Sequence, residues 1–112
     1  SAKDVEHLKV LRFVDCAEVK VEDFHSHRAL GLQIKGATEC DLAACSLFTC
    51  TKSKGFIRAR KFPRLRNKAV AVLDIPEGAG LSLINSDGHV NFWMYNSFDP
   101  LSAVTEVYEN EA

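Results

Sequence analysis

The chain has 112 residues, of which 46% are hydrophobic and 26% are charged, as is typical of a soluble globular protein. We therefore expect residues 1–112 to form a single domain, and the short apolar runs exclude a membrane-spanning helix and argue against a membrane partner. The formal net charge of −1 hides an asymmetry: residues 51–70 hold eight cations and no acid, whereas the rest combines six cations with 15 acids, a net of −9.

The N-terminal third contains one ambiguous segment followed by two predicted strands. Val5, Leu8 and Leu11 fit one face of a helix, but the neighbouring residues do not decide between helix and strand. Residues 18–22 and 29–35 alternate between polar and apolar side chains, which predicts half-buried strands.

Residues 38–50 combine an ambiguous helix start with three of the four cysteines. Residues 38–41 form a near capping box, which predicts a helix, whereas residues 46–49 taken alone predict a strand. The cysteines, at positions 16, 40, 45 and 50, contain no Cys-x-x-Cys pair, and neither helix nor strand geometry brings the last three to one metal. We interpret them as buried free thiols, with a disulfide or a metal or catalytic role as alternatives. Reduced thiols favour a cytoplasmic location.

His25 and His27 are the strongest candidate metal ligands. On a strand their side chains point the same way, about 7 Å apart, so the pair has the spacing to share a metal. No carboxylate lies in residues 28–35, and the chain has only two further histidines, His7 and His89. We therefore interpret the pair as surface residues and predict no metal and no cofactor. A metal-dependent enzyme that uses His25, His27 and His89 is a distant alternative.

The basic stretch from Lys52 to Lys68 is the main candidate site. We predict a strand over residues 56–62, whose even positions share one face, and an edge or bend at Pro63. Beyond this bend, alternate cations again share a face. The predicted cationic strand face consists of Phe56, Arg58, Arg60, Phe62, Arg64, Arg66 and Lys68.

Three uses of this stretch stay open. It could be a solvated edge whose charges prevent strand pairing. It could bind single-stranded nucleic acid or another polyanion, with arginines on phosphates and aromatic rings on bases, although the pI of about 6.4 lies below the value above about 9 that is typical of nucleic-acid domains. It could also contact a protein, including a second copy docked head to tail.

The C-terminal half predicts a long strand, a hairpin and a helix. Residues 64–75 alternate in a strand pattern, and residues 81–84 and 89–95 flank an Asn-Ser-Asp-Gly turn that is typical of a hairpin. The sequence Asp99-Pro100 predicts the start of a C-terminal helix.

The second hairpin strand carries the other candidate surface. Neither of its faces is polar, because Trp93 and Tyr95 lie opposite Phe92. The strand is therefore either covered on both sides or presents Trp93 and Tyr95 to a partner, since both residue types are favoured at interfaces.

The fold class that these patterns predict is mainly β, or α+β: a small antiparallel β-sandwich or barrel with a short C-terminal helix. No catalytic motif is present in the sequence. We predict a small, non-enzymatic binding or assembly module that uses the cationic strand face and Trp93 and Tyr95 for protein contacts or self-association. Binding of single-stranded nucleic acid or another polyanion through residues 52–68 is the alternative.

Overall fold

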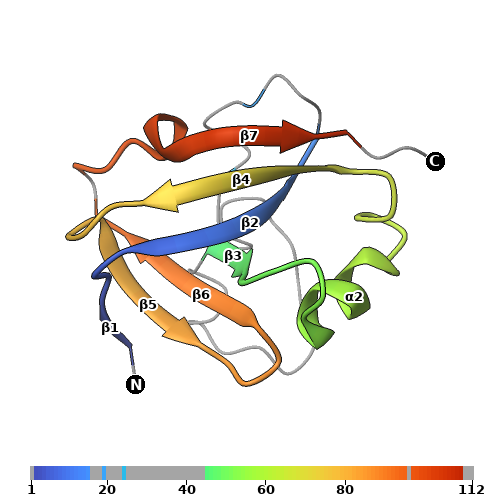
Figure 1. Ribbon diagram of the computed structural model, residues 1–112, viewed down its shortest axis with the longest axis horizontal. Coiled ribbons are helices and arrows are strands. Elements are labelled where there is room, and N and C mark those ends of the chain that lie inside the picture. Colours follow the sequence, from blue (N-terminus) through green and yellow to red (C-terminus); the bar gives the residue numbers. More distant parts are fainter. Residues whose placement is uncertain (1, 16–18, 20–23, 25–44, 96, 110–112) are drawn as a thin grey trace.

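The computed structural model describes residues 2–15, 19, 24, 45–95 and 97–109. In chain order the elements are β1 (Lys3–Asp4), β2 (Leu8–Val14), β3 (Cys45–Phe48), α2 (Lys54–Arg60), β4 (Ala69–Ile75), β5 (Gly80–Ile84), β6 (His89–Met94), the 3-10 helix η2 (Pro100–Ala103) and β7 (Val104–Tyr108). The described strands form one antiparallel sheet in the order β1-β5-β6-β3-β2-β4-β7 (Figure 1). The expected antiparallel β architecture is confirmed, but the described strands form an open sheet and neither a closed barrel nor a sandwich.

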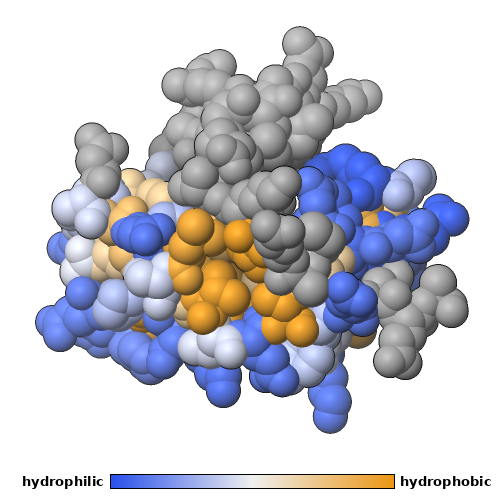
Figure 2. Space-filling model, turned by 90° about the horizontal axis from the view of Figure 1, so that it is seen from above, coloured by the Kyte–Doolittle hydropathy of each residue, from blue (hydrophilic) through white to orange (hydrophobic). Residues whose placement is uncertain are grey.

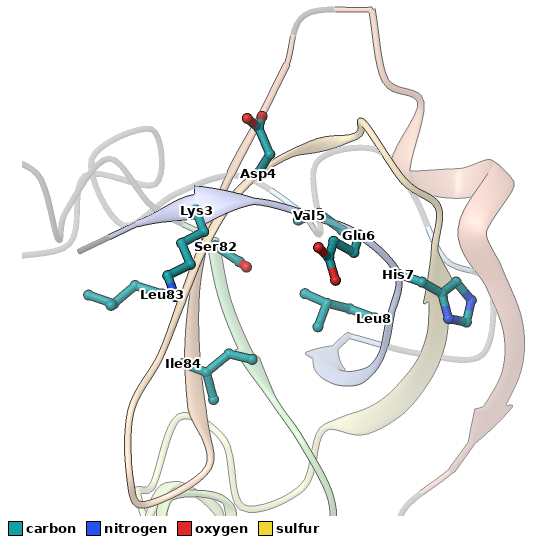
Figure 3. A pocket seen from close by; sticks show the side chains of 9 residues that line it. All are labelled: Lys3, Asp4, Val5, Glu6, His7, Leu8, Ser82, Leu83 and Ile84. Carbon is teal, nitrogen blue, oxygen red and sulfur yellow. The ribbon is translucent and has the colours of Figure 1, made fainter.

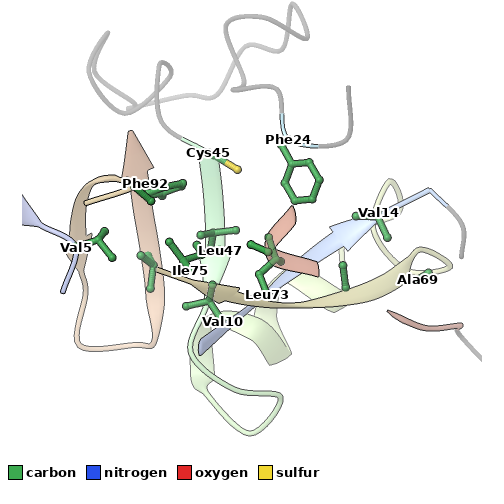
Figure 4. Packing of buried hydrophobic residues seen from close by; sticks show 14 residues of the cluster. Val5, Val10, Val14, Phe24, Cys45, Leu47, Ala69, Leu73, Ile75 and Phe92 are labelled. Carbon is green, nitrogen blue, oxygen red and sulfur yellow. The ribbon is translucent and has the colours of Figure 1, made fainter. Parts of the chain in front are cut away.

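The sheet buries apolar side chains on both faces, because successive residues of a strand point to opposite sides. Alternate residues of β4 belong to the larger cluster (Figure 4): Ala69, Ala71, Leu73 and Ile75. Val70 and Val72 point the other way, into a smaller cluster to which α2 also contributes. The alternation predicted for residues 64–75 is therefore confirmed from Ala69 on, whereas Leu65 packs against the smaller cluster. The strand begins at Ala69 and not at Arg64, because residues 61–68 form consecutive turns.

Strands β5 and β6 form the predicted hairpin, with ends that differ from the prediction by one residue. In the turn, the amide of Asn85 donates to the carbonyl oxygen of His89 at 2.8 Å. The amide of His89 donates to Oδ1 of Asp87 at 3.0 Å. Gly88 has a φ of 88°, in the left-handed region where a side chain would be strained. The turn residues therefore carry the information that positions this hairpin.

The predicted C-terminal helix is wrong. Asp99 does cap a helix, since its Oδ1 accepts from the amide of Leu101 at 3.1 Å, but η2 is a single 3-10 turn. The chain then continues as β7, which pairs with β4. Three residues of β7 are β-branched and favour a strand, and the edge of β4 offers backbone groups that need hydrogen-bond partners.

The ambiguous segments are strands where the structure describes them. β2 pairs with β4 along its whole length, and β3 confirms the strand interpretation of residues 46–49 against the helical one. The predicted strands over 18–22 and 29–35 lie outside the described residues, apart from Val19.

Two of the four cysteines are described, and both are free thiols. Cys45 is buried, and this burial raises the pKa of its thiol, so the prediction of a buried free thiol is confirmed there. The prediction is wrong for Cys50, which is exposed in the loop before α2.

Candidate binding surface

Residues 54–60 form the helix α2 and not the predicted strand. Its N-cap is Ser53, whose hydroxyl oxygen accepts from the amide of Phe56 at 3.3 Å. The capping serine was the sequence signal for this helix, and the alternation of the following residues obscured it. Because a helix repeats every 3.6 residues, the residues predicted to share a strand face point in different directions.

Phe56 belongs to the core and is not available for stacking on a ligand. It is 6% exposed, and its ring stacks on that of Phe13 with 4.8 Å between centroids. The ring of Phe48 contacts the Phe56 ring edge to face, with 5.7 Å between centroids. These aromatic contacts anchor α2 on the sheet, so the predicted ligand-stacking role of Phe56 is wrong.

Arg60 also serves the fold. Its guanidinium lies over the Phe13 ring, with 4.8 Å from Cζ to the centroid, and partial burial lowers its pKa. Its Nη1 donates to the carbonyl oxygens of Lys68 at 2.7 Å and of Leu65 at 3.3 Å. Arg60 therefore holds the turns that follow α2, and the donors of Nη1 are committed within the chain.

The outward face of α2 is cationic. Lys54, Ile57, Arg58 and Lys61 are all exposed, and their spacing of three and four residues places them on one side of the helix. Further exposed residues come from the flanking loop and turns. We call the whole set the basic surface: Lys52, Lys54, Ile57, Arg58, Lys61, Phe62, Arg64 and Arg66.

Two ion pairs with described acids lie at or beside this surface. Arg58 contacts Asp87 at 3.4 Å, and Lys68, at the margin, pairs with Asp15 at 2.9 Å. Within the described part of the chain, no hydrogen bond or ion pair involves the side chain of Lys54 or Lys61. A local excess of positive charge is therefore present, as the sequence predicts, but on a convex helix and turns instead of a strand face.

Some of the acids outside the basic stretch lie together at the end of the molecule that is farthest from the basic surface. β2 and β4 run antiparallel, with Ala69 next to the basic turns and Ile75 at the far end, which lies away from α2 (Figure 1). That far end carries exposed acids on β1, on β4 and in the adjoining turns: Asp4, Glu6, Asp74 and Glu77. Figure 2 shows hydrophilic residues at both ends of the long axis, with an apolar area between them.

A pocket of about 590 Å³ opens beside β1 (Figure 3), and no sequence pattern predicts it. It is lined by Lys3, Asp4, Val5, Glu6, His7, Leu8, Ser82, Leu83 and Ile84. Its apolar side chains include Ile84, which is 52% exposed. The carboxylate of Glu6 points toward the centre of the opening in Figure 3, and His7 pairs with Asp74 at the margin.

Trp93 and Tyr95 follow the predicted alternation. Trp93 pairs with Leu81 across the hairpin and is half-buried, on the face of the sheet opposite Phe92. Tyr95 is 40% exposed, and its hydroxyl donates to Oδ1 of Asp4 at 2.6 Å, which raises the pKa of the phenol. The hydroxyl of Tyr95 thus fastens β1 to the hairpin, while a contact with a partner stays a prediction.

The histidine site is not assembled in the part that the structure describes. His25 and His27 lie outside the described residues. His89 packs edge to face against Phe48, and its Nδ1 lies 3.3 Å from the side-chain Nδ2 of Asn85. Among the described residues, no three histidine, cysteine or acidic side chains are grouped to hold a metal ion.

Comparison with protein-family models, with curated proteins and with solved structures finds no significant match for this chain. None of the described helices has the length and apolarity needed to cross a membrane.

Proposed function

We propose that this protein is a small binding module and not an enzyme, and that its basic surface contacts an acidic partner protein. The observation that carries the proposal is the outward face of α2, where Lys54, Arg58 and Lys61 are exposed and, among the described residues, Asp87 is the one acid that pairs with any of them. Opposite charges on two proteins steer their encounter and set their orientation more than they add to affinity.

A protein partner suits this surface better than single-stranded nucleic acid does. Single-strand binders combine a basic groove with several rings that stack on bases. Here the surface is a convex helix, and Phe56 is buried and Arg60 is committed to the turns. Ile57 and Phe62 are 47% and 48% exposed among the cations, which fits the apolar centre of a protein interface with a polar rim.

Trp93 and Tyr95 form a second proposed contact area, on the hairpin. We further propose a cytoplasmic location, because Cys45 and Cys50 are both free thiols and reduced thiols are typical of that compartment.

The test measures binding of fluorescently labelled poly-L-glutamate and of a labelled single-stranded oligonucleotide by anisotropy, across a salt series. The double variant Lys54→Glu/Lys61→Glu removes two cations of the basic surface. Its matched control, Lys3→Glu/Lys9→Glu, makes the same change in net charge at exposed positions on β1 and β2. We expect the first variant to lose about tenfold or more in affinity for poly-L-glutamate at low salt, and the control to lose much less.

Equal losses in both variants would show that only net charge matters, which would contradict a localised binding surface. Tighter binding of the oligonucleotide than of poly-L-glutamate, with a logarithmic salt slope of about −0.7 per phosphate neutralised, would replace the acidic protein with nucleic acid as the partner.

A further inference from the structure

The pocket beside β1 and the basic surface have complementary features. The pocket is lined by Leu8, Leu83 and Ile84 together with Lys3 and Glu6, whose side chains point into the opening, whereas Asp4 points away from it and bonds to Tyr95. The basic surface exposes Ile57 and Phe62 among cations. One site is thus a hollow lined by both apolar and charged side chains at the acidic end of the molecule, and the other is a protrusion with apolar side chains and cations around them.

The two sites lie on different parts of the molecule. β1 pairs with β5 at one edge of the sheet, whereas α2 packs on β2, β3 and β4 through the smaller apolar cluster. They also lie toward opposite ends of the long axis in Figure 1. A chain therefore does not fill its own pocket with its own basic surface, but a second chain can.

We infer that a second copy of this protein docks its basic surface, with Phe62 foremost, into the pocket beside β1. This inference rests on the proposed function, because it identifies the acidic partner as another copy. A volume of about 590 Å³ accommodates an aromatic ring together with a neighbouring aliphatic side chain. Glu6 in the pocket, with Asp74 and Glu77 at the same end of the molecule, then attracts the cations that surround Phe62, and these three acids outnumber Lys3, the one lysine of the lining.

Such a contact joins two different surfaces and is therefore heterologous. Each docked copy leaves one pocket and one basic surface free at the two ends, so the contact repeats and builds an open chain of copies. We expect weak association, with a dissociation constant between micromolar and millimolar, since ion pairs at the rim contribute little affinity.

Two single variants test this geometry. Phe62→Asp removes the protruding ring and keeps the pocket, whereas Ile84→Arg fills the pocket and keeps the basic surface. Phe62 and Ile84 are 48% and 52% exposed, so both variants should fold, which near-UV circular dichroism checks. Sedimentation velocity should show that the wild type increases in mass with concentration and that each variant alone is monomeric.

Mixing the two variants is the decisive measurement. The intact pocket of Phe62→Asp should receive the intact ring of Ile84→Arg, which gives a 1:1 dimer and nothing larger. A mixture that stays monomeric, or a wild type that is monomeric at millimolar concentration, would overturn the head-to-tail contact. The proposed function is tested separately, because Ile84→Arg should bind poly-L-glutamate as the wild type does. If it binds while the wild type does not associate, only the self-docking is wrong.

Discussion

Arg60 and Arg64 are four residues apart in the basic stretch, yet they have different roles. Arg60 bonds to the carbonyl oxygens of Leu65 and Lys68 and covers the Phe13 ring, whereas Arg64 is exposed and belongs to the basic surface. A side chain that satisfies backbone carbonyls holds the local fold, and its loss leaves those groups unpaired. The same residue type thus serves stability at one position and recognition at the other.

We expect Arg60→Ala to lower the free energy of unfolding by about 2 kcal/mol, from lost charged hydrogen bonds and ring contacts. Arg64→Ala, the matched control, should change it by less than about 0.5 kcal/mol. Urea denaturation followed by tryptophan fluorescence measures both. If the two substitutions cost the same, Arg60 is not held as described and belongs to the basic surface after all.

At the scale of elements, the hairpin and α2 are joined through Asp87. Its Oδ2 contacts Arg58 and its Oδ1 accepts from the amide of His89, while its carbonyl oxygen accepts from the amide of Gly55 at 2.8 Å. A Cβ on Gly55 would lie 3.0 Å from that carbonyl oxygen, so glycine permits this close approach. The hairpin turn therefore positions the start of the basic helix.

Two substitutions of Asp87 distinguish the contribution of its turn hydrogen bond from that of its ion pair. Asp87→Ala should cost about 1–2 kcal/mol of unfolding free energy, because the amide of His89 loses its acceptor. Asp87→Asn keeps an oxygen at that place and removes the charge, so it should cost only about 0.5 kcal/mol, since the contact with Arg58 is exposed. Thermal denaturation distinguishes them. Equal costs would show that the ion pair outweighs the turn hydrogen bond.

The elements differ in how well the sequence predicts them. Elements that depend on neighbouring residues are predictable, whereas elements that depend on tertiary contacts are not. The hairpin was predictable because Asn85 and Gly88 have turn chemistry that acts within a few residues. Strand β7 could not be predicted in this way. Asp99 does cap a short helix, but pairing with the distant strand β4 turns the following residues into a strand. For α2, alternation suggested a strand, and burial of Phe56 against β2 and β3 stabilises the helix instead.

At the scale of the whole molecule, the sequence shows how charges are distributed along the chain, but it does not predict where the acids lie in the fold. The basic stretch is contiguous, so its charges stay together in any fold. The acids are scattered along the chain, and only strand pairing brings β1, the end of β4 and the adjoining turn to one end. The pocket arises from the pairing of β1 with β5, which are far apart in the chain, so no local pattern predicts it.

Repulsion within the basic surface should lower the stability of the folded protein, and the salt dependence of the melting temperature should show this. Lys54, Arg58 and Lys61 are like charges at spacings of three and four residues, and Lys54 lies at the start of α2, where the helix dipole disfavours a cation. Salt screens such repulsion, with a Debye length of about 10 Å at 0.1 M. It also weakens the exposed pairs of Arg58 with Asp87 and of Lys68 with Asp15, which act in the opposite sense.

Repulsion should win, because Lys54 and Lys61 contact no acid within the part of the chain that the structure describes, whereas Arg58 contacts one. We expect the melting temperature to rise by about 2–5 °C between low salt and 0.5 M NaCl, which corresponds to roughly 1 kcal/mol for a chain of this size. Over the same range, binding of poly-L-glutamate should weaken. Lys54→Glu should raise the melting temperature at low salt and reduce its salt dependence, while it weakens binding. A melting temperature that falls with salt would mean that the two ion pairs outweigh the repulsion, and the cations would then be explained by stability alone.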